Sequence, residues 1–226
     1  MFTNLRQRKK ITDMKRLLFI VALCLPLLSM AKKHDDTPYL KGAVPEQNGI
    51  VTFQKTFKVP NKSKQAIYQI MKPWLQKLVD ESIPAPGNYA RMNMDTPDTL
   101  VAKVCEYQVY TKKFLNLDRS RYRYTLSVVI DEGKVTITQS GLAWYYSEDQ
   151  EGNNGIIYRA EEWINDKYAL NKAGTKLLPR SGKFRRKTVD RANELFESAM
   201  DAFEPTPAQQ PAQQPVKKVR TGVVEE

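Results

Sequence analysis

Histidine and cysteine are nearly absent from this sequence of 226 residues. It contains one histidine, His34, and two cysteines, Cys24 and Cys105. A Ser–His–Asp triad, a Cys–His dyad and a Cys/His zinc site each need residues that the chain does not supply together. The sequence also has no glycine-rich phosphate loop and neither an HExxH nor a GxSxG motif. These absences count against the common hydrolytic and zinc-dependent chemistries.

Apolar runs long enough to cross a membrane, about 20 residues, are also lacking. The longest run is Leu17–Leu28, which is short and uncharged. Lys15 and Arg16 precede it, and Ser29-Met30-Ala31 supplies small residues at a cleavage site. This is the pattern of a secretory signal peptide. We therefore expect residues 1–31 to be removed, leaving an exported chain, periplasmic or at the cell surface, that is not an integral membrane protein.

Two alternatives at the N-terminus stay open. Translation could begin at Met1 or at Met14, since Met14 opens a more conventional signal sequence. Cys24 suggests a lipoprotein, but Leu23 stands where lipoprotein processing requires a small residue. After cleavage Cys105 is the sole cysteine, so an internal disulfide cannot form.

The charge balance is basic but moderate. The whole chain has a formal net charge of +11, and removal of residues 1–31, with six Lys or Arg and one Asp, lowers it to +6. Dedicated nucleic-acid binders concentrate a larger excess. Together with export, this charge argues against genomic DNA as a partner.

Composition divides the rest of the chain into three parts. Residues 32–48 are polar and predict a flexible lead. Residues 49–204 have the length and apolar content of a single domain. Residues 205–226 begin PTPAQQPAQQP and predict a disordered, Pro/Gln-rich tail.

The first half of the domain predicts a strand followed by a helix. Apolar and polar residues alternate over Ile50–Val59, which is typical of a strand with one buried face. Ser63–Glu81 repeats apolar residues at helical spacing, with Ser63 as N-cap. Pro73 removes a helical hydrogen bond, so we expect a kink or two shorter helices there.

The second half predicts mostly strands, at 88–95, Leu100–Tyr110, Arg121–Ile130 and Lys134–Gln139. A two-residue turn at Glu132-Gly133 would pair Ile130 with Val135 and Val128 with Ile137. We expect a short helix at Ala160–Lys167 and a long one at Lys187–Phe203, with Leu100–Tyr110 as a candidate edge strand. The fold class is therefore α+β, in the order β-α-β4-α: an antiparallel sheet of about five strands with two main helices on one face.

Several short motifs add a family resemblance. They are Tyr39–Pro45, Val59-Pro60 with Ser63-Lys64, and Gly182–Asp190 running into Glu194-Leu195-Phe196. Residues 39–203 thereby resemble an exported family described as a domain of unknown function with a TBP-like fold, found in Gram-negative gut bacteria. The resemblance implies a curved antiparallel sheet with two main helices. It implies no activity and transfers no functional residues.

The densest cluster of positive charge lies between residues 176 and 187. It consists of six cations around Phe184, namely Lys176, Arg180, Lys183, Arg185, Arg186 and Lys187. Such a cluster is a candidate site for a polyanion: lipopolysaccharide phosphates, an acidic glycan or extracellular DNA. Positive charge at a helix N-terminus opposes the helix dipole, which favours a functional use. The alternative is a solvated loop and first helical turn with Phe184 packed inward.

Aromatic residues form a second candidate site for a sugar or a lipid. The cluster comprises Trp144, Tyr145, Tyr146, Tyr158, Trp163 and Tyr168, of which we select Trp144, Tyr146 and Trp163. The alternative is core packing, with Trp163 covering the open end of the sheet.

The carboxylates give a weaker indication. Asp95 and Asp98 flank one turn, and Asp131 and Glu132 flank another. A glycosidase needs two carboxylates across a cleft, whereas turns use Asp for local hydrogen bonds. We interpret these residues as turn formers and Cys105 as a buried small apolar residue.

The leading hypothesis is an exported, non-catalytic binding module for an envelope polyanion or glycan, with no cofactor and no metal. A carrier of a small apolar ligand, held between the sheet and a helix, is the first alternative. An enzyme that uses carboxylate, Tyr and Lys chemistry is the second.

Overall fold

The computed structural model describes residues 34–82, 88–113, 116–146 and 155–204. The chain divides into two units, Met1–Asp35 and Asp36–Glu226, and the fold described below is that of the second unit. The expected signal peptide and the expected Pro/Gln-rich tail lie outside the described residues. Within the described part of the chain, no helix has both the length and the apolar character needed to span a membrane.

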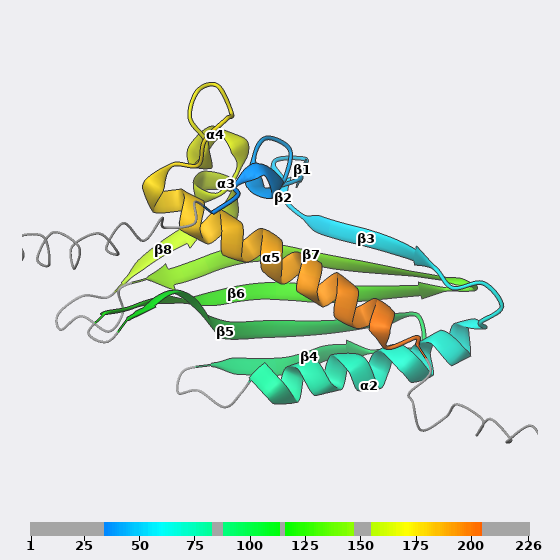
Figure 1. Ribbon diagram of the computed structural model, residues 1–226. Coiled ribbons are helices and arrows are strands. Elements are labelled where there is room, and N and C mark those ends of the chain that lie inside the picture. The colour runs from blue at the N-terminus through cyan, green and yellow to red at the C-terminus, as the bar shows by residue number, and fades with distance from the viewer. Residues whose placement is uncertain (1–33, 83–87, 114–115, 147–154, 205–226) are drawn as a thin grey trace, which may run out of the picture. The chain divides into compact units, whose positions relative to one another are not determined.

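The second unit is built on a six-stranded antiparallel sheet (Figure 1). In spatial order the strands are β3 (Phe53–Lys58), β7 (Lys134–Tyr146), β6 (Asn116–Asp131), β5 (Thr99–Lys113) and β4 (Tyr89–Asp95), and β8 (Ile156–Arg159) pairs with the end of β7. Two short strands, β1 (Glu46–Gln47) and β2 (Ile50–Val51), form a separate ladder. The predicted α+β class is confirmed. The sequence analysis predicted neither β1 nor β8, and its single strand at Ile50–Val59 is divided into β2 and β3.

The β6–β7 hairpin has the predicted register. Ile130 pairs with Val135 and Val128 pairs with Ile137, and all four side chains are buried. Gly133 has a φ of +63°, which supplies the left-handed conformation that this tight turn needs. β5 lies between β6 and β4, so the expectation that Leu100–Tyr110 is an edge strand is wrong over its paired length.

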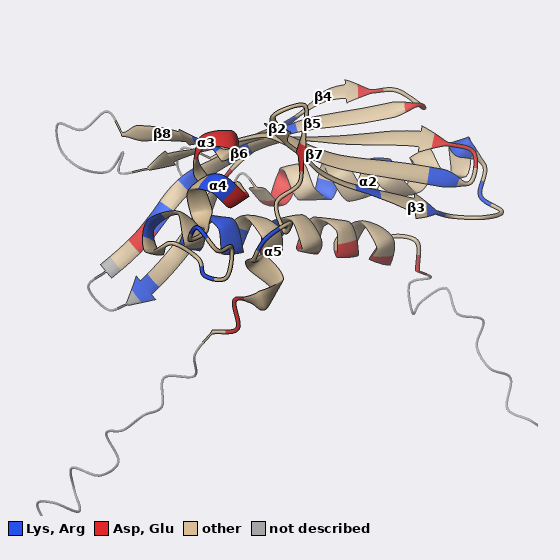
Figure 2. Ribbon diagram, turned by 90° about the horizontal axis from the view of Figure 1, so that it is seen from above, with Lys and Arg blue, Asp and Glu red and all other residues tan. Residues whose placement is uncertain are grey.

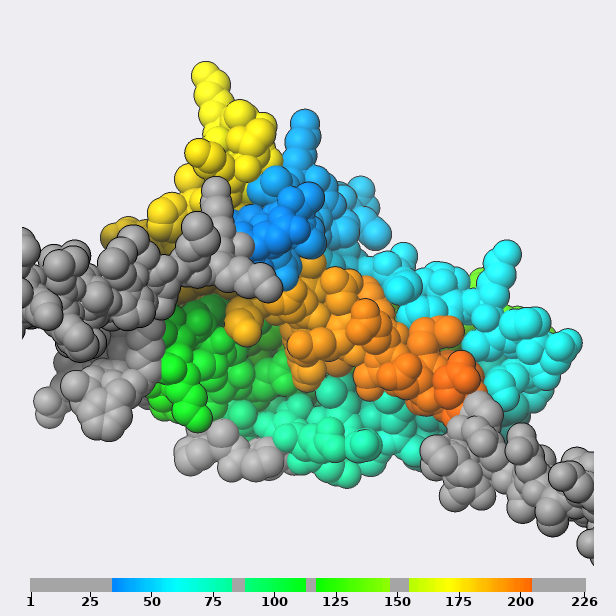
Figure 3. All heavy atoms as spheres, viewed as in Figure 1, coloured from blue at the N-terminus to red at the C-terminus, as the bar shows by residue number. Residues whose placement is uncertain are grey.

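Two long helices, α2 (Lys64–Ser82) and α5 (Pro179–Asp201), lie on the same face of the sheet (Figures 1 and 2). Figure 3 shows their surfaces side by side on this face. Three shorter helices, η2 (Thr37–Tyr39), α3 (Ala160–Trp163) and α4 (Asp166–Ala169), complete the unit. The opposite face of the sheet carries no helix of the described part of the chain.

Two residues of the α2 region, its N-cap and its internal proline, test the sequence prediction for this helix. The Ser63 hydroxyl accepts a hydrogen bond from the Ala66 N–H at 3.2 Å, which confirms the predicted N-cap. Pro73 lies inside one continuous helix, so the two-helix alternative is wrong. Pro73 is exposed, and the helical carbonyl that it leaves without a donor is therefore accessible to water.

The predicted elements after residue 159 differ from the structure. The short helix expected at Ala160–Lys167 is two single-turn helices. α3 ends at Trp163 with Ile164 as its C-cap, and the Asn165 side chain caps α4 by accepting from the Tyr168 N–H at 3.1 Å. The last helix begins at Pro179 rather than Lys187, so most of the basic segment is helical.

The predicted flexible lead at residues 32–48 also differs from the structure from Asp36 onward. Tyr39 and Val44 are buried, and the Tyr39 hydroxyl donates to Asp190 of α5 at 2.7 Å. The domain therefore begins at Asp36 rather than at residue 49, since this segment packs on α5.

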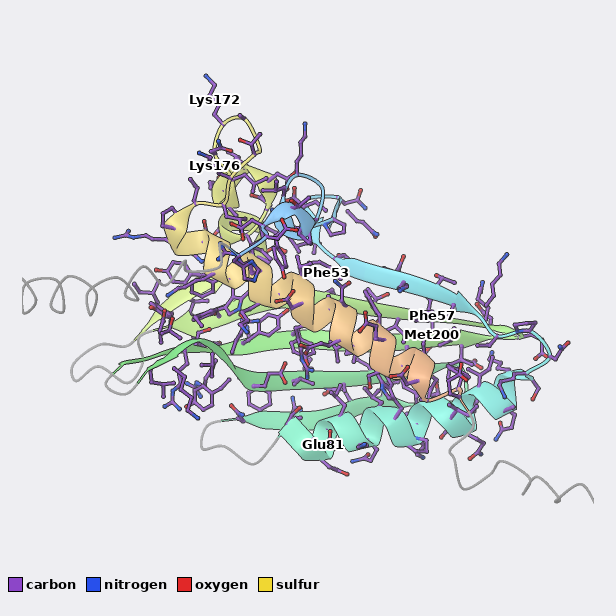
Figure 4. The ribbon with its side chains drawn as sticks, in the orientation of Figure 1. Phe53, Phe57, Glu81, Lys172, Lys176 and Met200 are labelled. Carbon is purple, nitrogen blue, oxygen red and sulfur yellow. The ribbon has the colours of Figure 1, made fainter. Side chains whose placement is uncertain are left out.

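The core lies between the sheet and the two long helices. α2 contributes Ile67, Met71 and Leu75, each with no exposed surface. Phe57 of β3 meets Phe196 of α5 edge to face, with ring centroids 6.5 Å apart. Figure 4 shows Phe57 beside α5.

Candidate functional site

The basic segment does not form one continuous charged surface. Because α5 begins at Pro179, the helical repeat turns successive cations to different sides. Lys176, Arg180 and Lys187 are exposed, and Figure 4 shows Lys176 pointing outward from the loop before α5. Arg185 is buried, and Lys183 is partly buried.

Arg185 is an internal crosslink rather than a ligand contact. Its side chain has no exposed surface and forms an ion pair with Asp166 at 2.6 Å. Its guanidinium also donates to the backbone carbonyls of Tyr39, Leu40 and Ile164 at 2.6–2.7 Å. Burial lowers the Arg185 pKa, against the opposing effect of Asp166. Its selection as a polyanion contact is therefore corrected, because no ligand can reach it.

Arg186 is committed to an ion pair as well. Its guanidinium donates to both carboxylate oxygens of Asp36, at 2.6 and 3.0 Å. These hydrogen bonds raise the Arg186 pKa. Lys183 is also in an ion pair, with Asp118 at 2.6 Å, so of the six predicted cations the three exposed ones are left to contact a ligand.

A cavity of about 430 Å³ brings together members of both predicted clusters. It lies between the end of the β7–β8 ladder and the start of α5, and is lined by Tyr146, Ile156, Tyr158, Trp163, Pro179, Arg180, Lys183 and Phe184. We call this cavity the aromatic pocket. Its volume falls within the range of about 300–1,000 Å³ that is usual for small-molecule sites.

Ring packing fixes the walls of the aromatic pocket. Tyr158 and Trp163 stack with centroids 4.0 Å apart and an interplanar angle of 18°. Phe184 meets the rings of Tyr146, Tyr158 and Trp163 at 5.6, 5.8 and 5.8 Å, in edge-to-face geometry. Such mutual packing restrains the rings before any ligand arrives.

Lys183 supplies the charge at the aromatic pocket. Its ammonium donates to Asp118 at 2.6 Å and to the Tyr146 hydroxyl at 3.0 Å, while that hydroxyl donates to the other Asp118 oxygen at 2.8 Å. Burial alone lowers the Lys183 pKa, but the hydrogen bonds to Asp118 and Tyr146 outweigh it, and the pKa is raised. Lys183 therefore stays protonated at neutral pH and acts as a cation, not as a base or a nucleophile.

Trp163 has a hydrogen-bond donor without an acceptor. Its indole Nε1 is buried and has no hydrogen-bond partner among the described residues. A buried donor left unpaired costs about 1–3 kcal/mol. A ligand oxygen that reached this atom would remove that cost.

The other predicted aromatic residues lie elsewhere. Trp144 has no exposed surface, and its Nε1 donates to Gln108 at 3.0 Å, so its selection as a ligand contact is corrected in favour of core packing. Tyr145 lies on the helix-free face, where its hydroxyl accepts from Arg123 at 2.7 Å. Tyr168 is 42% exposed and does not line the aromatic pocket.

The carboxylates hold turns and helix ends. Asp95 accepts from Tyr68 at 2.8 Å and pairs with Lys72 at 2.7 Å, and these hydrogen bonds lower its pKa. Glu132 accepts from the N–H of Lys64, the first residue of α2, at 2.9 Å.

Asp98 pairs with Lys64, and Asp131 pairs with Lys134 at 3.0 Å. Over the described ranges, no three His, Cys, Asp or Glu side chains gather into a potential metal site. The prediction that Cys105 is buried is confirmed.

A larger groove, of about 1,030 Å³, lies between α2 and the C-terminal end of α5. Its charged lining residues have both signs: Lys62, Lys77, Glu81, Asp201 and Glu204. None of the predicted site residues lines it. The aromatic pocket is therefore the stronger candidate site.

The fold and this pocket define an α+β protein of the TBP-like class, in which a helix-covered antiparallel sheet carries a small cavity at one end. The chain belongs to the DUF4468 family, described as a domain of unknown function with TBP-like fold, and the family profile matches residues 53–144. The predicted resemblance is thereby confirmed.

Two crystal structures are similar to this chain. A DUF4468 family protein from Bacteroides ovatus is 36% identical, with 79% of this chain and 100% of that chain covered and a TM-score of 0.68. A TBP-like protein from Parabacteroides distasonis is 19% identical, with 71% and 96% covered and a TM-score of 0.58, which supports the fold alone. No curated protein matches this chain.

The residues that match the family profile do not include the lining of the pocket. The matched residues 53–144 run from β3 into β7, whereas most of the pocket lining comes from residues 156–184. Sequence reasoning had named Tyr146, Trp163, Arg180 and Lys183. It missed Ile156, which reaches the cavity because β8 pairs with β7. It also missed Asp118, which is outside the lining but accepts hydrogen bonds from the lining residues Tyr146 and Lys183.

Proposed function

We propose that this protein is an exported, non-catalytic binding module that holds a ligand in the aromatic pocket. The observation that carries the proposal is a cavity of about 430 Å³ whose walls are four packed aromatic rings and whose lining includes Lys183, which is paired with Asp118, and the exposed Arg180. Aromatic rings bind the apolar faces of sugars and lipids, and cations orient an acidic group. The ligand is accordingly an acidic sugar unit, or another small molecule that combines an apolar face with an anionic group.

Two polar groups favour an acidic sugar over a wholly apolar ligand. The Trp163 indole N–H has no acceptor among the described residues, and the exposed Arg180 lines the same cavity. An apolar ligand would leave the indole N–H without an acceptor and would desolvate the Arg180 guanidinium. The apolar carrier is therefore the alternative outcome of the test.

The ionisable groups support binding rather than catalysis. Lys183 and Asp118 form a 2.6 Å ion pair, and the raised Lys183 pKa keeps the amine charged. A general base or nucleophile needs a free lone pair near neutral pH, which this arrangement withholds.

Calorimetric titration with acidic and neutral oligosaccharides tests the pocket. We expect a trisaccharide of galacturonic acid to bind and the matched galactose trisaccharide to bind at least tenfold more weakly. Trp163→Ala should weaken acidic trisaccharide binding about tenfold, the equivalent of roughly 1.4 kcal/mol of lost ring contact. Arg180→Gln, at an exposed position, should have a similar effect without disturbing the fold.

Tyr168→Ala is the matched control, because Tyr168 is an exposed aromatic residue outside the pocket. Equal affinity of wild type and both pocket variants would contradict the proposal. Binding of a fatty acid with no response to either trisaccharide would favour the apolar carrier instead.

Export is tested on its own. The sequence pattern at residues 1–31 supports cleavage after Ala31. We expect N-terminal sequencing of protein recovered from the periplasmic or extracellular fraction to begin near Lys32. Recovery only in the cytoplasm, with the N-terminus intact, would contradict this part of the proposal.

A further inference from the structure

A projecting lobe beside the start of α5 combines exposed lysines with large exposed apolar side chains. It is formed by the turn around Lys41, by α4 and by the loop that leads from α4 to α5, and it stands out from the rest of the second unit (Figures 1 and 3). Its exposed residues of these two kinds are Lys41, Lys167, Tyr168, Lys172, Lys176 and Leu178. We call these six residues the lysine lobe.

Local contacts fix the backbone from which these lysines extend. The Asn171 side-chain oxygen accepts from the Lys176 N–H at 3.0 Å. A Cβ at Gly174 would lie 3.5 Å from the Cβ of Lys41, so the turn and the loop are in contact. Figure 4 shows Lys172 at the tip of this loop, pointing away from the protein. The lysines can therefore reach a flat partner without a large rearrangement of the loop.

The lobe has an excess of positive charge. Residues 167–189 contain no Asp or Glu. Asp166, directly before this stretch, pairs with Arg185 at 2.6 Å, and Glu162 is the exposed carboxylate of α3. Over the described ranges, no carboxylate forms an ion pair with any of the four lysines of the lobe. Their ammonium groups therefore remain available to an anionic partner.

Two apolar side chains accompany this charge. Tyr168 is 42% exposed and Leu178 is 38% exposed. The Lys167 ammonium lies over the Tyr168 ring, 4.9 Å from its centroid. A ring with a polar tip beside a lysine stem suits a boundary between water and an apolar phase. The lobe thus offers both of the attractions, electrostatic and apolar, that bind proteins to membrane surfaces.

We propose that the lysine lobe docks on a lipid bilayer that contains anionic headgroups. Small-molecule sites are concave, whereas this lobe projects, so an extended surface fits it better (Figure 3). Lysines are point charges on flexible stems, which suits a layer of lipid phosphates. A soluble polyanion would match the charge but leave Tyr168 and Leu178 in water. The aromatic pocket begins at Pro179, directly after Leu178, so docking brings the pocket near the membrane.

Co-sedimentation with lipid vesicles tests the docking. The protein used begins at Lys32, because residues 1–31 are apolar enough to bind vesicles themselves, and it contains the whole second unit. We expect binding to vesicles of phosphatidylcholine and phosphatidylglycerol at a ratio of about 7:3, and at least tenfold weaker binding to phosphatidylcholine alone. Lys172→Gln/Lys176→Gln should weaken binding to the anionic vesicles at least tenfold. Equal binding to both kinds of vesicle would overturn the proposal.

Lys58→Gln/Lys103→Gln is the matched control, because it removes the same charge from exposed positions on β3 and β5, outside the lobe. It should lose less than twofold in vesicle affinity. Equal losses in the two double variants would overturn the proposal, since they would show attraction by net charge alone.

Tyr168→Ala tests the apolar part of the docking. It should weaken vesicle binding about threefold, because the exposed ring no longer enters the headgroup region. Unchanged vesicle binding by Tyr168→Ala would overturn the choice of a bilayer over a soluble polyanion.

The pocket variant Trp163→Ala separates this proposal from the proposed function. We expect it to bind anionic vesicles as the wild type does, because Trp163 lines the pocket and is not part of the lysine lobe. Loss of vesicle binding in Trp163→Ala would place the membrane contact at the pocket and contradict the lysine lobe. Failure of the trisaccharide to bind wild-type protein that still binds vesicles would contradict the proposed function alone.

Discussion

Adjacent residues of α5 have different roles because a helix advances each side chain by about 100°. Arg185 is buried among carbonyl oxygens of the N-terminal segment and α3, whereas Arg186 reaches Asp36 at the surface. The sequence shows two consecutive arginines in a basic run, and nothing in that run distinguishes them. Only the start of the helix at Pro179 and the positions of its partners decide which arginine is inside.

Replacement of Arg185 by lysine should destabilise the domain strongly. Lysine keeps the charge, but its single ammonium cannot reach three carbonyls and Asp166 together. Removing part of a buried charge network costs about 3–5 kcal/mol. We expect Arg185→Lys to lower the free energy of unfolding in urea by about 2–4 kcal/mol.

Arg186→Lys is the matched control. Its side chain is 31% exposed and pairs with a partly exposed carboxylate, so we expect a cost below about 1 kcal/mol. Similar unfolding free energies for both variants would show that Arg185 is not the crosslink that the geometry indicates.

At the scale of elements, hairpins and capped helices could be predicted because their signals are local. The β6–β7 register follows from alternation on both strands and from Gly133 at the turn. The N-cap at Ser63 follows from a hydroxyl placed directly before an apolar repeat. Each of these signals lies within a few residues of the structure that it determines.

The start of α5 could not be predicted, because its determinants are distant in the chain. Lys183, Arg185 and Arg186 look like a solvated loop until Asp118, Asp166 and Asp36 are placed beside them.

In the sequence, the glycine at position 182 also favours a loop over a helix. In the helix a Cβ at Gly182 would lie only 2.8 Å from the Cβ of Leu177, so glycine permits a close approach there.

The sequence predicted individual residues of the candidate site but not that they meet in one cavity. Tyr146, Trp163 and Lys183 were each selected, but from two separate clusters. They meet because β7 runs on to Tyr146, β8 pairs with its end and α5 crosses the sheet beside them. Such long-range pairing has no signature within either cluster.

At the scale of the whole molecule, the sheet separates two surfaces of different chemistry. The covered face ends in the aromatic pocket, where rings and one partly buried ion pair meet. The helix-free face carries the exposed side chains of Arg91 and Lys103, which pair across β4 and β5.

The tyrosines make the stability of the whole domain sensitive to alkaline pH. Burial raises the pKa values of Tyr110, Tyr122 and Tyr124 in the folded state. Burial and the hydrogen bond to Asp190 raise the pKa of Tyr39 from 10.0 to about 12. Below pH 10 both folded and unfolded chains keep these protons, so the full stability is present. Above pH 10 the unfolded chain releases protons that the folded chain retains, and the free energy of unfolding falls.

The variant Tyr39→Phe removes one of these ionisable hydroxyl groups and so measures its contribution. Between pH 10 and pH 11, urea titrations should show the wild type losing more stability than Tyr39→Phe, by at most about 1 kcal/mol, because only the wild type carries the Tyr39 proton. At pH 7 the variant should be the less stable protein, since it lacks the hydrogen bond to Asp190. Tyr168→Phe, which removes an exposed hydroxyl, is the control and should follow the wild type at every pH. Parallel curves for wild type and Tyr39→Phe above pH 10 would contradict the raised Tyr39 pKa, and with it the close packing of the N-terminal segment against α5.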